Sequence, residues 1–229
     1  CDFRSQDVAM GGQGAPLVPV GDKLLFSEYD ACLNLGGFAN GSYSQNGIMI
    51  AYDLCAVNTV LNFLAEKKGV PFDKDGVLAK NGTLIPDFFN ELEGLSFYKK
   101  THPKSLGIEW VYATLFPLLE KHKTNSIEDL IHTYTFHISK VIGISFSAGQ
   151  KVLVTGGGAK NTYLMSLIRE HSDALMVVPG EMVVDFKEAL IFGFLGILRL
   201  RNQVNCLASV TGVSKNHSSG SIFYPINDR

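Results

Sequence analysis

Several features are scarce in this chain of 229 residues, and each absence excludes a class of protein. No apolar run reaches the roughly 20 residues that a membrane-spanning helix needs, and the longest, residues 189–200, is expected to be a buried helix. The formal net charge is −2, so a nucleic-acid surface is not expected. Internal repeats and low-complexity tracts are missing. With 46% apolar residues, the chain can form one large domain or two small ones.

Cysteine and histidine show no metal motif. The 4 cysteines are scattered and form no C-x-x-C pair, which indicates reduced thiols and a cytoplasmic location. His132 and His137 are five positions apart, not the i, i+4 spacing of a metal-binding helix face. We therefore expect no metal ligands, and the histidines are interpreted as structural or solvent-exposed: His102, His122, His132, His137, His171 and His217. The chain begins with Cys1, not Met, so a segment in front of it is expected.

Two glycine turns are the most informative feature present. The apolar stretch 152–155 runs directly into three glycines, and a helical pattern follows over residues 161–171. A second turn, at residues 36–37, follows another apolar strand. Glycine lets the backbone approach a ligand closely, so the pair suggests a nucleotide held between two backbone loops. Each turn alone could equally be a tight corner or a strand bulge.

The order of elements predicts the fold class. Three short strands are expected at 31–38, 42–45 and 48–53, with hairpin turns at Asn40-Gly41 and Asn46-Gly47. Next come a helix at 58–68, a mixed helical region at 70–125 and a helix opened by Ser126. Strand 151–155, helix 161–171, strand 174–178 and helix 185–201 follow. This order is typical of an α/β fold with a ribonuclease-H-like mixed sheet and helices on both faces.

Six motifs, in this order along the chain, resemble the signatures of the anhydro-N-acetylmuramic acid kinase family: residues 7–19, 33–40, 72–76, 103–107, 155–161 and 209–212. The resemblance implies one lobe of the actin, Hsp70 and sugar-kinase superfamily. Residues 1–21 would be the interlobe crossing and substrate loop, and residues 22–229 the C-terminal lobe with a helical insertion at about 70–125. The family's N-terminal lobe, with its Gly-Thr-Ser-x-Asp-Gly phosphate loop, has no counterpart in the chain.

The resemblance also implies an activity and its residues. Such a kinase uses ATP and Mg²⁺ to open the 1,6-anhydro ring with water and phosphorylate O6. Asp7 would be the general base, although a helix cap or a solvated aspartate is the simpler interpretation; Asp2 is expected to be a bystander. Substrate contacts are expected at Gly12, Gln13, Gly14 and Glu188, and ATP contacts at Asn34, Gly36, Gly37, Gly156, Gly157 and Gly158.

Two alternatives stay open at this point. Glu188 could instead be a first-turn carboxylate that favours the helix dipole, while Gly193 and Gly196 are expected to permit close helix packing. The chain has Asp53-Leu54-Cys55-Ala56 where the family has Asp-Thr-Gly-Pro, and Ile108 where the family has arginine. These departures leave room for a non-catalytic nucleotide-binding or assembly module. The expected partners are a small amino sugar and ATP, without nucleic acid or membrane; a homodimer is left open.

Overall fold

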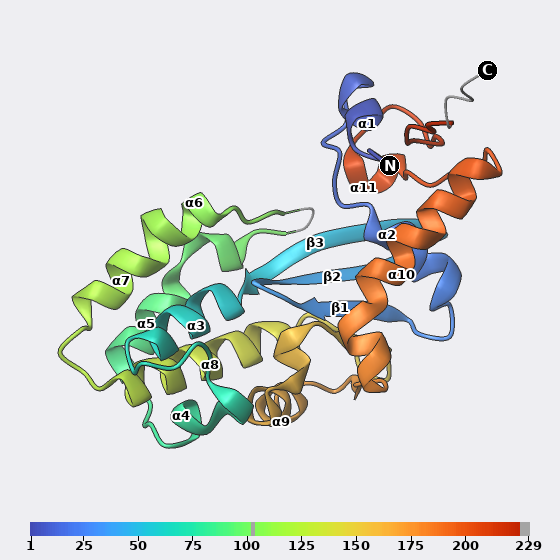
Figure 1. Ribbon diagram of the computed structural model, residues 1–229. Coiled ribbons are helices and arrows are strands. Elements are labelled where there is room, and N and C mark those ends of the chain that lie inside the picture. Colours follow the sequence, from blue (N-terminus) through green and yellow to red (C-terminus); the bar gives the residue numbers. More distant parts are fainter. Residues whose placement is uncertain (102–103, 225–229) are drawn as a thin grey trace. The chain divides into compact units, whose positions relative to one another are not determined.

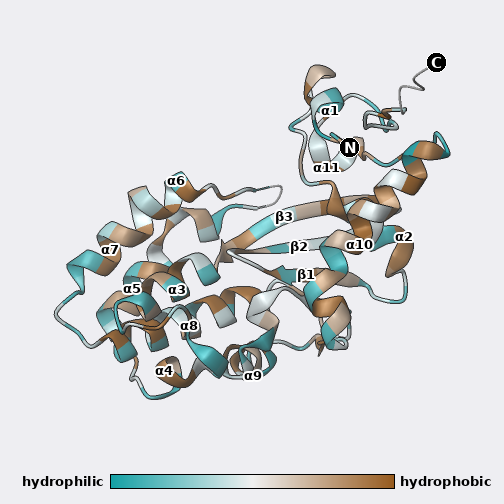
Figure 2. Ribbon diagram, in the orientation of Figure 1, coloured by the Kyte–Doolittle hydropathy of each residue, from teal (hydrophilic) through white to brown (hydrophobic). Residues whose placement is uncertain are grey.

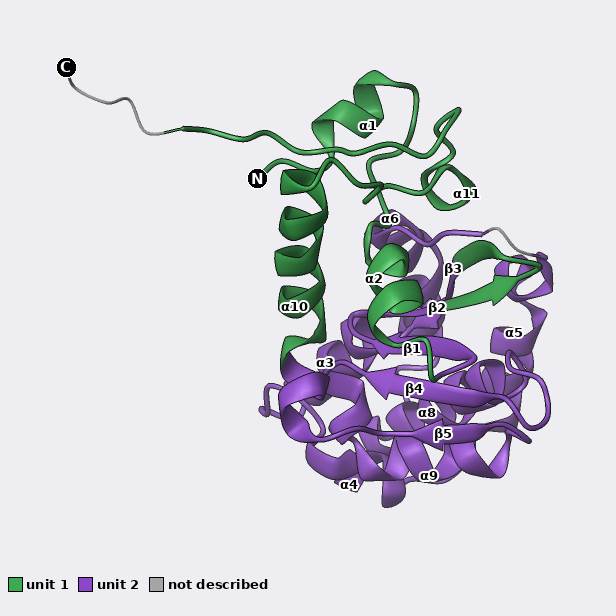
Figure 3. Ribbon diagram, turned by 90° about the vertical axis from the view of Figure 1, so that its right-hand side faces the viewer, with its two compact units in different colours: residues 1–28, 42–51, 186–229 green, residues 29–41, 52–185 purple. Residues whose placement is uncertain are grey.

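The computed structural model describes residues 1–101 and 104–224, so His102 and Pro103 lie outside the described residues. The chain forms two compact units (Figure 3). Unit 1 comprises residues 1–28, 42–51 and 186–229, and unit 2 comprises residues 29–41 and 52–185. The division follows tertiary contacts rather than chain order. The domain boundary expected after residue 21 therefore stays a prediction.

One five-stranded sheet has the strand order β3-β2-β1-β4-β5 (Figure 1). Two-residue connections join the first three strands, which therefore run antiparallel, whereas β1 pairs with β4, and β4 with β5, in parallel. The mixed sheet predicted from the sequence is confirmed. The strands are β1 Ala31–Leu35, β2 Phe38–Gln45, β3 Ile48–Ala56, β4 Lys151–Thr155 and β5 Leu175–Val177.

The first predicted turn is wrong, and the second is right. Asn40 and Gly41 lie inside β2, and the chain reverses earlier, at Gly36-Gly37, where the Gly36 N–H donates to the Phe38 carbonyl at 3.1 Å. Asn46 and Gly47 do form a hairpin turn, with φ of 52° and 80°. Both residues of such a turn need positive φ, which asparagine and glycine adopt most readily.

Helices occupy most of the rest of the described chain. Side-chain caps fix two of them: Ser126 accepts from the Asp129 N–H at 3.0 Å, as its spacing predicted, and Asn161 accepts from the Leu164 N–H at 2.9 Å. The helices are α1 Ser5–Ala9, α2 Val18–Leu25, α3 Asn58–Glu66, α4 Val77–Lys80, α5 Pro86–Gly94, α6 Ile108–Trp110, α7 Phe116–Lys121, α8 Ile127–Gly143, α9 Thr162–Glu170, α10 Glu181–Leu200 and α11 Ala208–Thr211. One π-helical turn, Val111–Leu115, joins α6 to α7.

Helix α10 begins four residues earlier than predicted. Glu188 therefore lies in the helix interior, so the interpretation as a first-turn carboxylate is wrong. Helix α10 carries both hydrophobic and hydrophilic residues (Figure 2), and its charged residues lie within positions 181–188 and at Arg199. Its close packing partner in unit 1 is Gly21 of α2, where a Cβ would lie 2.5 Å from the Ile191 side chain. Gly193 and Gly196 have nothing within 4 Å of a Cβ, so the close approach expected of them is wrong.

Candidate functional site

The predicted site residues divide between the two units. Asp7, Gly12, Gln13, Gly14 and Glu188 belong to unit 1, and the six predicted ATP-binding residues belong to unit 2. Each group is described by itself.

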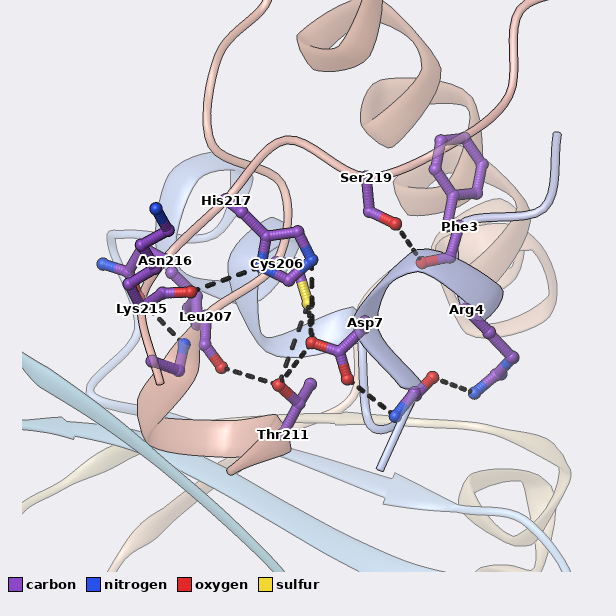
Figure 4. A network of polar contacts seen from close by, with 12 residues as sticks. Phe3, Arg4, Asp7, Cys206, Leu207, Thr211, Lys215, Asn216, His217 and Ser219 are labelled. Atoms are coloured by element: carbon purple, nitrogen blue, oxygen red, sulfur yellow. Dashed lines mark hydrogen bonds and ion pairs between the residues drawn. The ribbon is translucent and has the colours of Figure 1, made fainter. Parts of the chain in front are cut away.

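In unit 1, the Asp7 side chain is completely buried and hydrogen-bonded on both oxygens (Figure 4). Its Oδ1 accepts from the Thr211 hydroxyl at 2.8 Å and from the Cys206 thiol at 3.0 Å. Its Oδ2 accepts from the Gly14 N–H at 2.7 Å. A carboxylate offers about four acceptor positions, so one position on Oδ2 is left. The helix-cap and solvated-aspartate interpretations do not describe this side chain.

The charge of Asp7 is stabilised by these donors. Burial alone would raise the pKa of the Asp7 carboxyl, but the bonds from Cys206, Gly14 and Thr211 outweigh it and hold that pKa below its usual value. The same burial, with the neighbouring carboxylate, raises the pKa of the Cys206 thiol to about 12. At neutral pH the site therefore holds an ionised Asp7 and a protonated Cys206 that donates to it.

The glycine-rich loop after α1 is shaped around Asp7. Gly14 has a φ of +70° and is buried, while a Cβ on Gly12 would overlap Asp7 Oδ2. The Gln13 N–H donates to the Thr211 carbonyl at 2.9 Å, which joins the loop to α11. The Gln13 side chain is exposed, as is that of Glu188. Glycine at position 12 is therefore required by the close approach of the loop to the carboxylate.

Asp2 differs from Asp7 in every respect that matters for access. It is exposed, it has a φ of 50°, and its Oδ1 accepts from the Ser5 N–H at 3.1 Å. This bond is the main cause that lowers the pKa of the Asp2 carboxyl. A positive φ in a residue other than glycine is uncommon and is found often at functional sites. Asp2 is thus a second carboxylate at the start of the same segment.

In unit 2, parallel pairing of β1 and β4 brings the two glycine turns together. Asn34 is in register with Thr155, so both turns follow the same edge of the sheet. A Cβ on Gly156 would lie 2.7 Å from Asn34 Oδ1, and one on Gly158 would lie 2.8 Å from the Leu35 Cβ. Ligands in sheets of this type commonly bind beyond the carboxyl ends of parallel strands. The structure confirms that the turns are adjacent, and the ligand itself stays a prediction.

The start of α3 closes the side of the first turn. The N–H groups of Val57 and Thr59 donate to the Gly37 carbonyl at 2.7 and 3.2 Å, and a Cβ on Gly37 would lie 2.8 Å from the Thr59 hydroxyl. By contrast, a Cβ on Gly157 would meet only Asn58 Nδ2, at 3.7 Å. The buried Thr155 hydroxyl has no hydrogen-bond partner among the described residues. Gly157 therefore borders open space where a ligand would fit, and Asn58 and Thr59 are neighbours that the sequence analysis did not identify.

In unit 2, Asp53 binds the segment that comes shortly before Ile108. The Asp53 N–H donates to the Lys104 carbonyl at 3.0 Å, and Asp53 Oδ2 accepts from the Leu106 N–H at 2.7 Å. Its Oδ1 accepts from the Asn40 amide. The aspartate that the chain retains therefore holds the 104–106 segment in place, even though the three residues after it differ from the family.

The residues around Asp7 were not predicted as its neighbours. Thr211 belongs to the 209–212 motif, and Cys206 lies three positions before that motif. The motif itself was not connected with Asp7. His217 was interpreted as structural or exposed, yet its side chain is buried next to Asp7 and Cys206. Nothing in the local sequence pairs positions 7 and 206. The one signal that could have identified these neighbours is the presence of cysteine, histidine and carboxylate side chains near the glycine motifs.

The mixed α/β sheet and its paired glycine turns place the chain in the ribonuclease-H-like class. The sequence profile described as "AnmK: Anhydro-N-acetylmuramic acid kinase" matches residues 1–225. The chain belongs to the anhydro-N-acetylmuramic acid kinase family, as its motifs predicted.

Curated relatives of this name agree with that assignment. The protein from Aliivibrio fischeri is 34% identical over 239 residues, which cover 99% of this chain and 65% of the relative. Proteins of the same name from Rhodococcus erythropolis and Vibrio cholerae are 34% and 31% identical, and the matches cover 61% and 64% of their lengths. The chain therefore spans somewhat less than two thirds of the length of these relatives.

Proposed function

We propose that the protein containing this chain is an ATP-dependent kinase that hydrolyses the 1,6-anhydro ring of anhydro-N-acetylmuramic acid and phosphorylates O6. The product would be N-acetylmuramic acid 6-phosphate, formed during peptidoglycan recycling. Membership of the family supports the reaction class. The observation on which the proposal depends most is the Asp7 carboxylate, fixed by three hydrogen bonds next to Gly12. A non-catalytic module is not favoured, because the relatives are named as kinases.

In this proposal Asp7 is the general base. It is ionised at neutral pH, and its Oδ2, which accepts one bond from the Gly14 N–H, has one acceptor position left. A water or sugar hydroxyl that donates there would lose its proton to Oδ2 as it reacts. Gly12, Gln13 and Gly14 would form the wall of the sugar site, with Glu188 as a further contact. Asp2 is the alternative base and is tested alongside Asp7.

ATP would bind at the paired glycine turns of unit 2. Gly157 borders open space, and the Thr155 hydroxyl at this edge has no partner among the described residues, so the residues fit a polar ligand. ATP supplies the phosphoryl group, and Mg²⁺ neutralises its charge. Asn34 would hold the magnesium ion through a water molecule. Mg²⁺ usually keeps several of its waters, and the amide oxygen of Asn34 can accept a hydrogen bond from one of them. The backbone of Gly36, Gly37, Gly156, Gly157 and Gly158 would line the nucleotide site.

The direct test is a coupled assay on the full-length gene product, with ATP, Mg²⁺ and anhydro-N-acetylmuramic acid. We expect ADP formation that depends on the sugar, and a product whose mass has increased by one phosphoryl group and one water. N-acetylglucosamine serves as the control sugar, because it has no anhydro ring. Nucleotide binding without sugar-dependent ADP formation would support the non-catalytic alternative instead.

Location and oligomeric state are also proposals. No helix in the described ranges 1–101 and 104–224 has the length and apolar character to cross a membrane. We propose a cytoplasmic protein, in keeping with the three buried cysteines, which form no disulfide. A homodimer is proposed as well, with the exposed apolar side chains Leu190, Ile197 and Leu200 of α10 as candidate contacts. Light scattering on the full-length protein, wild type against Leu190→Lys, measures whether a dimer forms and whether α10 contributes to it.

A further inference from the structure

Three different metal-ligand types meet in unit 1 around one oxygen of Asp7. The Cys206 Sγ lies 3.0 Å and the His217 Nε2 lies 3.7 Å from Asp7 Oδ1, and all three atoms lie within 4.8 Å of one another (Figure 4). All three side chains are buried, with exposed fractions of 0% for Asp7, 1% for Cys206 and 8% for His217. A carboxylate, a thiol and an imidazole together are a ligand set that zinc accepts.

The backbone holds Cys206 and His217 opposite each other. They form an isolated antiparallel bridge, in which the Cys206 N–H donates to the His217 carbonyl at 3.1 Å and the His217 N–H donates back at 3.2 Å. Residues paired in this way direct their side chains to the same side, with Cβ atoms roughly 5 Å apart. Asp7 is fixed separately by Thr211 and by the Gly14 N–H. The three ligand atoms are therefore held close together before any ion binds.

The orientation of His217 leaves the correct nitrogen free. Its Nδ1 lies 3.3 Å from the Lys215 carbonyl, which can only accept, so Nδ1 carries the hydrogen in this contact. Its Nε2 is buried and has no hydrogen-bond partner among the described residues. An imidazole that donates one N–H to a backbone carbonyl and presents the other nitrogen is the usual arrangement of a metal-bound histidine. An unpartnered Nε2 next to an anionic carboxylate is the feature that the hydrogen-bond network alone does not explain.

We propose that Asp7 Oδ1, Cys206 Sγ and His217 Nε2 form a binding site for one divalent zinc-like ion, distinct from the magnesium that accompanies ATP. In a tetrahedral zinc site these ligand atoms would be about 3.3 to 3.6 Å apart, which follows from zinc bond lengths of about 2.0 to 2.3 Å. The separations of 3.0 and 3.7 Å from Asp7 Oδ1 each differ from this range by about half an ångström or less, and the Cys206 Sγ and His217 Nε2 atoms lie within 4.8 Å of each other. A thiolate ligand favours zinc, cobalt or nickel over magnesium and calcium. The fourth position would be open to water.

Charge and protons balance on binding. The ion replaces the thiol proton of Cys206, which passes to solvent, so that a dication meets one carboxylate, one thiolate and one neutral imidazole. The buried site is then neutral overall, which limits the cost of burying the charge. The ion would also occupy the oxygen of Asp7 opposite the proposed reactive one and withdraw electron density from it. Inhibition by zinc is therefore expected, and this consequence alone rests on the proposed function.

The experiment titrates chelator-treated protein with Co²⁺, which reports its ligands by absorption. The background carries Cys1→Ser, because Cys1 is an exposed thiol that would bind metal on its own. We expect one equivalent bound, with visible bands of tetrahedral intensity, a near-ultraviolet thiolate-to-cobalt band, release of one proton, and displacement by Zn²⁺. Cys206→Ser should abolish the thiolate band, and His217→Gln should weaken binding by tenfold or more.

His171→Gln is the matched control, since His171 lies in unit 2 and should leave the titration unchanged. Melting of each variant without metal shows that it is folded. Absence of stoichiometric binding by folded protein, or a thiolate band that persists in Cys206→Ser, would overturn the metal site. These results do not depend on the kinase assay. Sugar phosphorylation can fail while cobalt still binds, and cobalt binding can fail while sugar phosphorylation is retained.

Discussion

Asn34 of β1 and Gly156, which directly follows β4, are 122 positions apart in the sequence, but β1 and β4 are adjacent in the sheet, and a Cβ on Gly156 would lie 2.7 Å from Asn34 Oδ1. Gly156 also has a φ of +86°. Its glycine is thus required by the fold itself. Gly157, the next residue, has a φ outside the left-handed region and open space in front of it. The two neighbours therefore separate a glycine that the fold requires from one that the proposed nucleotide site would require.

The first prediction uses this contrast. Gly157→Val should weaken ATP binding roughly tenfold, which corresponds to about 1.4 kcal/mol, because the new side chain projects into the proposed nucleotide space. Its melting temperature should stay near that of the wild type. Calorimetric titration with ATP and thermal melting measure the two effects. Equal ATP affinity in folded Gly157→Val would remove this turn from the nucleotide site.

The control for that prediction is Gly156→Ala. It should destabilise the fold by more than Gly69→Ala, whose glycine has a similar φ of +79° but nothing within 4 Å of a Cβ. Both positions have a positive φ, but the ψ of Gly156 is 167°, a conformation that is essentially restricted to glycine. The difference between the two variants therefore measures the backbone strain at Gly156 together with the crowding against Asn34 and Leu35.

The second prediction separates the two carboxylates of the first segment. Asp7→Asn keeps the size of the side chain but removes the base, so turnover in the coupled assay should fall by about 10²- to 10⁴-fold while ATP affinity is retained. Asp2→Asn should leave turnover within a few-fold. The opposite pattern, with Asp2→Asn inactive and Asp7→Asn active, would transfer the role of base to Asp2.

The third prediction concerns a buried ion pair in unit 1. The Lys187 ammonium lies 2.7 Å from Asp22 Oδ1, both side chains are 6% exposed, and the Ser42 hydroxyl donates to Asp22 Oδ2 at 2.6 Å. Lys187→Met should lower the free energy of unfolding by about 3 to 5 kcal/mol, because it leaves the buried Asp22 carboxylate without its cation. Urea denaturation measures this.

Two matched variants test that cause. Lys123→Met removes a lysine from a pair with Glu120 that is 67% and 61% exposed, and it should cost no more than about 0.5 kcal/mol. The double variant Asp22→Asn with Lys187→Met should recover part of the loss, since no buried charge is left unpaired. A double variant as unstable as Lys187→Met alone would mean that packing, not charge, is responsible.

The fourth prediction is a pH dependence in unit 2. His137 is fully buried, its Nδ1 contacts Glu93 Oε1 at 2.9 Å, and burial lowers its pKa from 6.5 to about 4 against the opposing effect of Glu93. Between these values the unfolded chain binds a proton that the folded chain does not. Stability is therefore complete above pH 6.5 and falls as the pH drops towards 4, by up to about 3 kcal/mol.

The measurement compares unfolding free energies of the wild type and His137→Gln from pH 7.5 to 4. The variant cannot titrate at this position, so the difference between the two curves should change steadily over the window from 6.5 to 4 and be flat above it. Parallel curves throughout would show that His137 titrates alike in the folded and unfolded chain.

Local chemistry determined much of this protein from the sequence alone. Apolar runs set the order of strands and helices, the Asn46-Gly47 pair fixed one hairpin, and Ser126 marked the start of α8, because each of these depends on residues only a few positions apart. Where neighbours along the chain were ambiguous, the prediction failed. Asn40-Gly41 continues β2, since the chain had already reversed at Gly36-Gly37, and α1 and α2 were missed because short helices carry little periodic signal.

Tertiary structure alone decided what surrounds each functional residue. Asp7 meets Cys206 across 199 residues of sequence, and the β1–β4 pairing brings Gly156 beside Asn34. Contacts of this kind are set by how the β-strands pair and how distant segments pack, which no window of local sequence encodes. The motifs therefore supplied the candidate residues, whose roles stay predictions, whereas the burial of Asp7, its thiol and hydroxyl donors and the nearby His217 imidazole follow only from the folded chain.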